Sequence, residues 1–114
     1  MLRRAAALLS ALGSAEAELS ILITDDAEMR ELNRRYKKLD RATDVLSFPM
    51  GGALLGDVVI SAETAARRAG RRLDREITFL LVHGVLHLHG HNHKKLGERR
   101  KMRARERELM RLVG

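Results

Sequence analysis

The 114-residue sequence contains no cysteine, no tryptophan and only one proline. Without cysteine the chain forms no disulfide and offers no thiolate, so a transition-metal site has to use imidazole or carboxylate ligands. The absence of cysteine is also typical of cytosolic proteins, and we expect a cytoplasmic location. Because we find no linker, internal repeat or low-complexity tract, we expect a single domain over residues 1–114.

Aromatic residues and long apolar runs are also scarce. Two Phe and one Tyr in a chain that is 45% hydrophobic indicate an aliphatic interior. No stretch approaches the roughly 18 consecutive apolar residues that cross a bilayer, so we expect no membrane partner. Residues 1–13 faintly resemble a signal peptide, but Ser10 interrupts their short apolar run, and we interpret them as an amphipathic first helix.

The charge balance is strongly positive, with 22 Lys and Arg against 15 Asp and Glu, a net charge of +7. Such an excess favours a polyanionic partner such as nucleic acid over a neutral or cationic one. Much of it comes from residues 94–114, where nine Lys and Arg stand against three Glu. A run of this kind is equally typical of a solvated helix face, so both interpretations stand at this point.

The periodicity of apolar residues predicts an α+β fold. We expect a largely buried strand at residues 18–24 and two more strands at residues 45–48 and 55–60. Helices are expected at residues 26–38 after a cap offered by Thr24, Asp25 or Asp26, at 62–69 after Ser61, and at 95–113. Between the last two, a central buried helix is expected to begin at a cap on Asp74 and to end at Gly90.

All five histidines lie between residues 83 and 93, in the stretch HGVLHLHGHNH. His83 and His87 are one helical turn apart, so their imidazoles project from one face and are able to converge on one ion. After Gly90 the chain can fold back so that His93 supplies a third ligand. Three protein ligands leave one position open, as in catalytic zinc sites. We therefore predict one zinc per chain, with nickel or a similar ion as an alternative.

The ligand spacing matches the HExxHxxGxxH pattern of metzincin proteases, so the central helix is zincin-like. The Glu that serves those proteases as general base is replaced here by Gly84, which disfavours peptide hydrolysis by that mechanism. His89 and His91 are expected on the surface or behind the ligands rather than on the metal.

The sequence also resembles the YbeY family of bacterial endoribonucleases, whose signature is HGxLHLxGYDH. His83, Gly84, Leu86, His87, Leu88, Gly90 and His93 match it in place. The block LNRRYKKLDRATDVLSFP is similar to the family's LNxxYRxxDxxTDVLSFP, and LGDVVIS to its following strand. The resemblance implies a small mixed β-sheet packed with several helices, a single metal, hydrolysis of single-stranded RNA, and a role in ribosomal RNA maturation and ribosome quality control.

Three positions depart from the family pattern. Lys37 stands where the family usually has arginine, which keeps the charge but loses the planar fork that grips phosphate in two places. Asn92 and His91 replace the usual Asp and Tyr, so a carboxylate near the metal has become a neutral amide. The C-terminal helix is also more basic than the resemblance implies.

The leading hypothesis is a zinc-dependent endoribonuclease that cuts single-stranded RNA, with ribosomal RNA and ribosomal particles as partners. Lys37 is the candidate catalytic residue, and Arg34 or Arg35 are candidates to help hold the phosphate. Asp44 and Asp57 either orient groups near the site or merely form turns. The main alternative is an RNA- or ribosome-binding assembly factor with a structural zinc, and another is a zinc hydrolase of small substrates.

Overall fold

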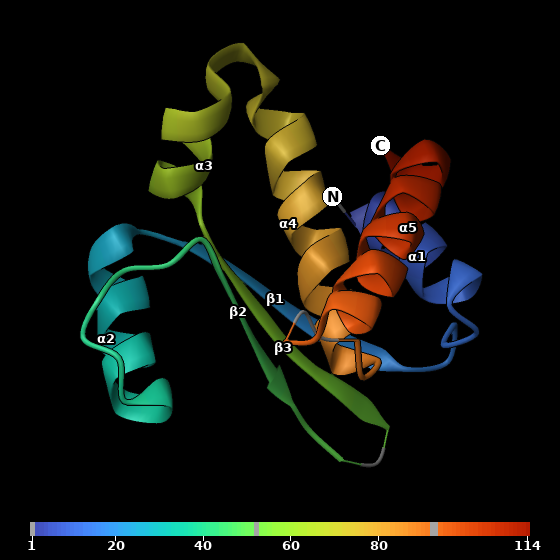
Figure 1. Ribbon diagram of the computed structural model, residues 1–114, viewed down its shortest axis with the longest axis horizontal. Coiled ribbons are helices and arrows are strands. Elements are labelled where there is room, and N and C mark those ends of the chain that lie inside the picture. The colour runs from blue at the N-terminus through green and yellow to red at the C-terminus, as the bar shows by residue number, and fades with distance from the viewer. Residues whose placement is uncertain (1, 52, 92–93) are drawn as a thin grey trace.

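The computed structural model describes residues 2–51, 53–91 and 94–114 (Figure 1). The helices and strands of these residues are, in chain order, α1 (Leu2–Ala11), β1 (Glu18–Thr24), α2 (Asp26–Lys37), β2 (Val45–Pro49), β3 (Leu54–Ser61), α3 (Ala62–Ala69), the 3-10 turn η1 (Gly70–Arg72), α4 (Leu73–Leu88) and α5 (Leu96–Val113). None of these helices combines the length and the apolar character that crossing a bilayer requires.

The three strands form one small mixed sheet in the order β1-β3-β2. β1 runs parallel to β3, and β2 runs antiparallel to it. Val58 at the centre of β3 faces Ile21 on one side and Ser47 on the other. The expected α+β fold with a small mixed sheet is therefore confirmed.

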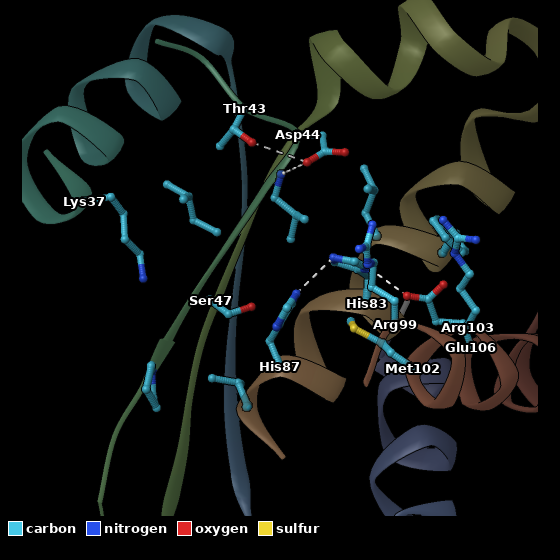
Figure 2. Close-up of a pocket in the computed structure, with 16 residues that line it drawn as sticks. Lys37, Thr43, Asp44, Ser47, His83, His87, Arg99, Met102, Arg103 and Glu106 are labelled. Atoms are coloured by element: carbon cyan, nitrogen blue, oxygen red, sulfur yellow. Dashed lines mark hydrogen bonds and ion pairs between the residues drawn. The ribbon is translucent and has the colours of Figure 1, made fainter. Parts of the chain in front are cut away.

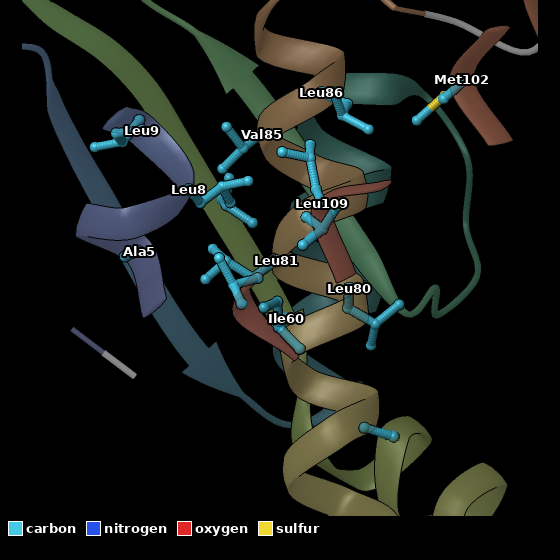
Figure 3. Close-up of a cluster of buried hydrophobic side chains, with 14 residues drawn as sticks. Ala5, Leu8, Leu9, Ile60, Leu80, Leu81, Val85, Leu86, Met102 and Leu109 are labelled. Carbon is cyan, nitrogen blue, oxygen red and sulfur yellow. The ribbon is translucent and has the colours of Figure 1, made fainter. Parts of the chain in front are cut away.

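Helices cover both faces of the sheet, and α4 is the most buried of them. Val58 and Ile60 of β3 pack into a large aliphatic cluster with the buried face of α4, where α1 and α5 complete the core (Figure 3). Val59, between them on the strand, points to the other face and packs with Met29 of α2 and Leu46 of β2. Figure 1 shows α2 on one side of the sheet and α4, α5 and α1 on the other.

The expectation that β1 would be largely buried is wrong. β1 pairs only with β3 and lies at the edge of the described sheet, where Leu22 is 45% and Ile23 is 41% exposed. Its other apolar residues, Leu19 and Ile21, do pack against the main core. The apolar run predicted a strand correctly, but its hydrophobicity did not determine its place in the sheet.

Two of the expected helix caps are confirmed and one is wrong. Asp25 accepts a hydrogen bond from the backbone N–H of Glu28, and Ser61 accepts one from that of Thr64. Asp74 does not cap α4, because η1 runs directly into Leu73 and places Arg72 at the cap position without a side-chain hydrogen bond. Asp74 lies instead in the first turn of α4, where a carboxylate favours the helix dipole.

Gly84 lets α4 lie close against the sheet. A Cβ atom at this position would stand 2.7 Å from Cγ1 of Val58 and 3.1 Å from the hydroxyl of Ser47. That hydroxyl donates a hydrogen bond of 2.9 Å to the Gly84 carbonyl and so ties β2 to α4. The contact sets the distance between the sheet and α4, the helix that carries His83 and His87.

We predict that Gly84→Ala is less stable than Gly97→Ala, because only the first variant crowds a packed interface. Both positions are helical, and nothing lies within 4 Å of a Cβ atom built at Gly97. Relative to that control, overpacking should lower the free energy of unfolding of Gly84→Ala by about 1–3 kcal/mol. Chemical denaturation of both variants measures the difference, and equal stabilities would show that α4 has room at Gly84.

A second prediction concerns acid stability. Hydrogen bonds from the hydroxyls of Ser61 and Thr64 and the ion pair with Arg67 lower the pKa of Asp26 to about 2 from its usual 3.8. A carboxyl group with a depressed folded-state pKa stabilises the fold above its unfolded pKa and loses that contribution as the pH falls through the folded value.

Asp26→Asn should therefore have a lower Tm than the parent chain at neutral pH, and the gap should close between about pH 4 and pH 2. Thermal unfolding across this range is the measurement. Glu16→Gln, a change at an exposed carboxylate before β1, serves as the control. A gap for Asp26→Asn that stays constant down to pH 2 would contradict the assignment.

Candidate metal centre and active-site cleft

A cleft of about 830 Å³ opens where β2, the end of α2, α4 and α5 meet (Figure 2). The polar side chains that line it are Lys37, Thr43, Asp44, Ser47, His83, His87, Arg99, Arg103 and Glu106. They come from segments far apart in the sequence, so the fold assembles the site.

His83 and His87 project from the same face of α4 into this cleft (Figure 2). Their Nε2 atoms lie 3.1 Å apart, and the ring centroids are separated by 4.7 Å. Two nitrogens that each bond one tetrahedral zinc at about 2.0–2.1 Å lie about 3.3 Å from each other. The described part of the donor set thus fits a zinc-type ion.

The other ring nitrogen of each histidine is held by an oxygen acceptor. Nδ1 of His83 lies 2.7 Å from the Glu106 carboxylate, and Nδ1 of His87 lies 2.9 Å from the carbonyl of His91. A carbonyl or an ionised carboxylate only accepts, so each Nδ1 carries the proton and donates. In this tautomer, a metal ion bound between the rings would replace the direct Nε2–Nε2 contact and take the lone pair of each Nε2.

The third expected ligand, His93, lies outside the described residues, as does Asn92. Within the described part of the chain, no group of three His, Cys, Asp or Glu side chains surrounds a common point. The prediction of a three-histidine site therefore rests on the geometry of His83 and His87 together with the sequence spacing.

Sequence reasoning missed Glu106 as a site residue. Glu106 is only 8% exposed, on the face of α5 that also buries Met102 and Leu109. A charged residue on an otherwise apolar helical face was the available signal, because a buried carboxylate requires a partner. The identity of that partner is not visible in the sequence, since His83 lies 23 residues away on another helix.

Lys37 lines the cleft opposite the histidines, at the end of α2. Its ammonium group stands 5.3 Å from the centre of the Phe48 ring, which holds the flexible side chain by a cation–π contact. Arg34 and Arg35 do not line the cleft, and both form ion pairs with Glu31 on the exposed side of α2. Of the three expected cations, only Lys37 lines the cleft, and it does so from the α2 face of the sheet, across the edge strand β2 from the histidine pair.

The two aspartates considered in the sequence lie in different places. Asp44 lines the cleft, but it accepts from the Val45 N–H and forms an ion pair with Arg68, so it is held at the cleft's edge. Asp57 lies on β3 one position from Val58 and two from Val59, so it shares the α2 face of the sheet. It therefore lies on the far side of the sheet from His83 and His87.

His89 and His91 take supporting positions. The two ring nitrogens of His89 bond the Ser14 hydroxyl at 2.7 Å and the Val85 carbonyl at 3.0 Å, which joins the end of α4 to the loop before β1. His91 contributes its carbonyl to His87, as described above. Both nitrogens of His89 are thus occupied by bonds to groups other than the cleft histidines.

Two cations of α5 complete the cleft, and sequence reasoning assigned them only to a basic helix. Arg99 and Arg103 line the same wall as Glu106, one helical turn apart (Figure 2). Together with Lys37 they give the cleft three cationic side chains against the carboxylates of Asp44 and Glu106. A phosphate ester is the kind of group that such a cleft attracts.

Comparison with known proteins agrees with this geometry. The sequence model of the family described as Endoribonuclease YbeY matches residues 2–114. An Endoribonuclease YbeY of Anaeromyxobacter dehalogenans is 53% identical over 97% of this chain, and one of Aquifex aeolicus is 54% identical over 82%. The chain spans 62% of the first relative's length and 67% of the second's.

A solved structure has the same fold. The solution structure of a Thermotoga maritima protein matches with a TM-score of 0.69, covering 98% of this chain and 77% of the other, at 22% identity. The resemblance seen in the three sequence blocks is confirmed, and the chain belongs to the YbeY family.

Proposed function

We propose that this chain is a metal-dependent endoribonuclease that cuts single-stranded RNA during ribosomal RNA maturation and ribosome quality control. The observation that carries the proposal is the pair of converging Nε2 atoms, 3.1 Å apart, in a cleft lined by Lys37, Arg99 and Arg103. The name of the relatives, Endoribonuclease YbeY, supports the same reaction. Ribosomal RNA and ribosomal particles are the proposed partners, and the cytoplasm is the proposed location.

In this proposal His83, His87 and His93 hold one zinc ion, or nickel in its place. The bound ion supplies a Lewis acid that polarises a phosphate oxygen or lowers the pKa of water. Glu106 keeps His83 in the tautomer and orientation that binding requires, and the His91 carbonyl does the same for His87. Residues 1–114 act as one unit, because the cleft draws on α2, β2, α4 and α5.

The remaining cleft residues bind and orient the RNA. In the proposal, Lys37, Arg99 and Arg103 hold phosphate oxygens of the RNA in the cleft, and their presence in its lining supports this role. The residue after the first histidine, Gly84, offers no side chain to serve as a general base, and its packing leaves no space for one. These features favour phosphodiester over peptide substrates.

Metal analysis tests the ligand set. Protein purified without added metal should contain about one zinc or similar ion per chain, because three imidazoles suit borderline metals. His83→Ala, His87→Ala and His93→Ala should each lose stoichiometric metal. His89→Ala should retain it, because its ring already bonds Ser14 and Val85.

Glu106→Gln provides a graded variant in the same experiment. It preserves shape but removes the charge behind His83, so zinc affinity measured against a competing chelator should fall about 10–100-fold. The ligand assignment fails if His89→Ala empties the site as fully as His93→Ala does.

Single-turnover cleavage of a short unstructured RNA tests Lys37. Lys37→Ala should cleave at least about tenfold more slowly, about 1.4 kcal/mol of transition-state stabilisation, with its metal retained. Lys37→Arg should match or exceed the natural chain, because a guanidinium forms two parallel hydrogen bonds to phosphate.

The neighbouring Lys38→Ala is the matched control, because Lys38 is exposed and does not line the cleft. Equal rates in all forms would remove Lys37 from the mechanism. Binding of RNA without cleavage, even by Lys37→Arg with full metal, would instead favour an assembly factor with a structural zinc.

A further inference from the structure

A second hollow, of about 950 Å³, lies between the α3–η1–α4 corner and α5. We name it the arginine groove, because six arginines line it: Arg68, Arg72 and Arg75 from the corner, and Arg103, Arg107 and Arg111 from α5. The carboxylate side chains among its lining residues are Glu76 and Glu106. The groove therefore carries a clear positive excess.

This charge is not neutralised within the described part of the chain. Arg68 forms ion pairs with Asp44 and Glu76, and Glu106 is engaged by His83. Among the described residues, no ion pair involves the other five arginines of the groove. These five arginines are exposed to solvent, and their like charges attract an anion to the groove.

The spacing of the arginines on α5 arranges the excess positive charge in a line. Arg103, Arg107 and Arg111 recur every fourth residue, which aligns them along one side of the helix. They form a row that begins at the active-site cleft and leads away from it. The sequence showed only a basic helix, whereas the fold shows that this row faces further arginines on the opposite wall.

The groove and the active-site cleft adjoin each other. Phe79, Arg103 and Glu106 line both of them. An RNA strand with one phosphate at the histidine pair therefore reaches the arginine groove with its neighbouring nucleotides. The row of arginines along the groove suits an RNA strand, which carries a phosphate at every nucleotide.

We propose that the arginine groove binds the backbone of single-stranded RNA on one side of the phosphate that is cut. The inference rests on the proposed function, because the cleft supplies the first phosphate of the path. Guanidinium groups bind phosphate oxygens in pairs and do so without reading the base. A flat membrane surface does not enter a hollow between two helices, and an acidic peptide is the competing ligand that the experiment includes.

The test compares two double variants that lose the same charge. The groove variant is Arg72→Gln with Arg107→Gln. The control is Arg71→Gln with Lys101→Gln, which changes exposed neighbours on η1 and α5 that line neither hollow. The measurement is the Kd of the intact chain for a single-stranded RNA of about 12 nucleotides, at several salt concentrations.

The groove variant should bind at least about tenfold more weakly, and its plot of log affinity against log salt should be shallower by about 1.4, since each lost phosphate contact accounts for about 0.7. The control should stay within about twofold of the natural chain. A trinucleotide, which fills only the cleft, should bind both variants equally. Tm values confirm that both variants are folded.

Equal losses in the two variants would overturn the inference, because they would show a general charge effect. The inference also fails if the groove variant loses as much affinity for the trinucleotide as for the longer RNA. Displacement of RNA by a poly-glutamate peptide at equal concentration would assign the groove to an acidic protein instead.

Binding does not depend on turnover, so the two proposals fail separately. If the chain cleaves no RNA but its affinity for RNA depends on the groove, the proposed nuclease function is wrong and the proposed RNA binding by the groove stands. An active nuclease whose groove variant binds RNA normally would refute the groove alone.

Discussion

The hydrogen bond between His83 and the buried carboxylate of Glu106 joins the two helices on which the site and the groove depend. Removing a carboxylate from water is costly unless it is hydrogen-bonded, so Glu106 requires its partner as much as His83 requires an acceptor. The bond orients the His83 ring, and together with the buried Met102, Leu109 and Val113 it sets the rotation of α5 about its axis. With that rotation set, Arg99 and Arg103 face the cleft, and Arg107 and Arg111 face the arginine groove.

The basic character of α5 acquires a specific meaning from this arrangement. In the sequence, nine cations over residues 94–114 fit a solvated face as well as a nucleic-acid surface. In the structure, the cations divide by position on the helix. Lys101 lines neither hollow, whereas Arg103 lines both. The position of each cation on α5 therefore says more about where an anion binds than the net charge does.

Local patterns predicted the parts of the fold that local physics controls. Asp25 and Ser61 cap their helices because a capping side chain needs only the N–H groups two or three residues ahead. One failure was tertiary: Leu22 and Ile23 are exposed because β1 lies at the sheet's edge. The other was local: Asp74 is not a cap because η1 runs directly into α4 before it.

The candidate site likewise has residues that local spacing predicted and residues that only the packing of the fold brings in. His83 and His87 share a face because a helix repeats nearly every four residues, so their spacing in the sequence was sufficient to pair them. Glu106 reaches His83, and Ser47 reaches the carbonyl of the adjacent Gly84, only through the packing of α5 and β2 against α4. Arg34 and Arg35 resembled Lys37 in charge and position, but their direction on α2 turns them to Glu31 instead of the cleft.

The close packing at Gly84 separates this chain from metal-dependent proteases by more than one mutation. A change of this glycine to glutamate would complete the HExxH letters, but the new side chain would have to pass through Val58 and Ser47. A smaller residue at Val58 would have to come first, and it would leave a hole in the present core. A conversion between the two chemistries therefore requires repacking between α4 and the sheet as well as the change at Gly84.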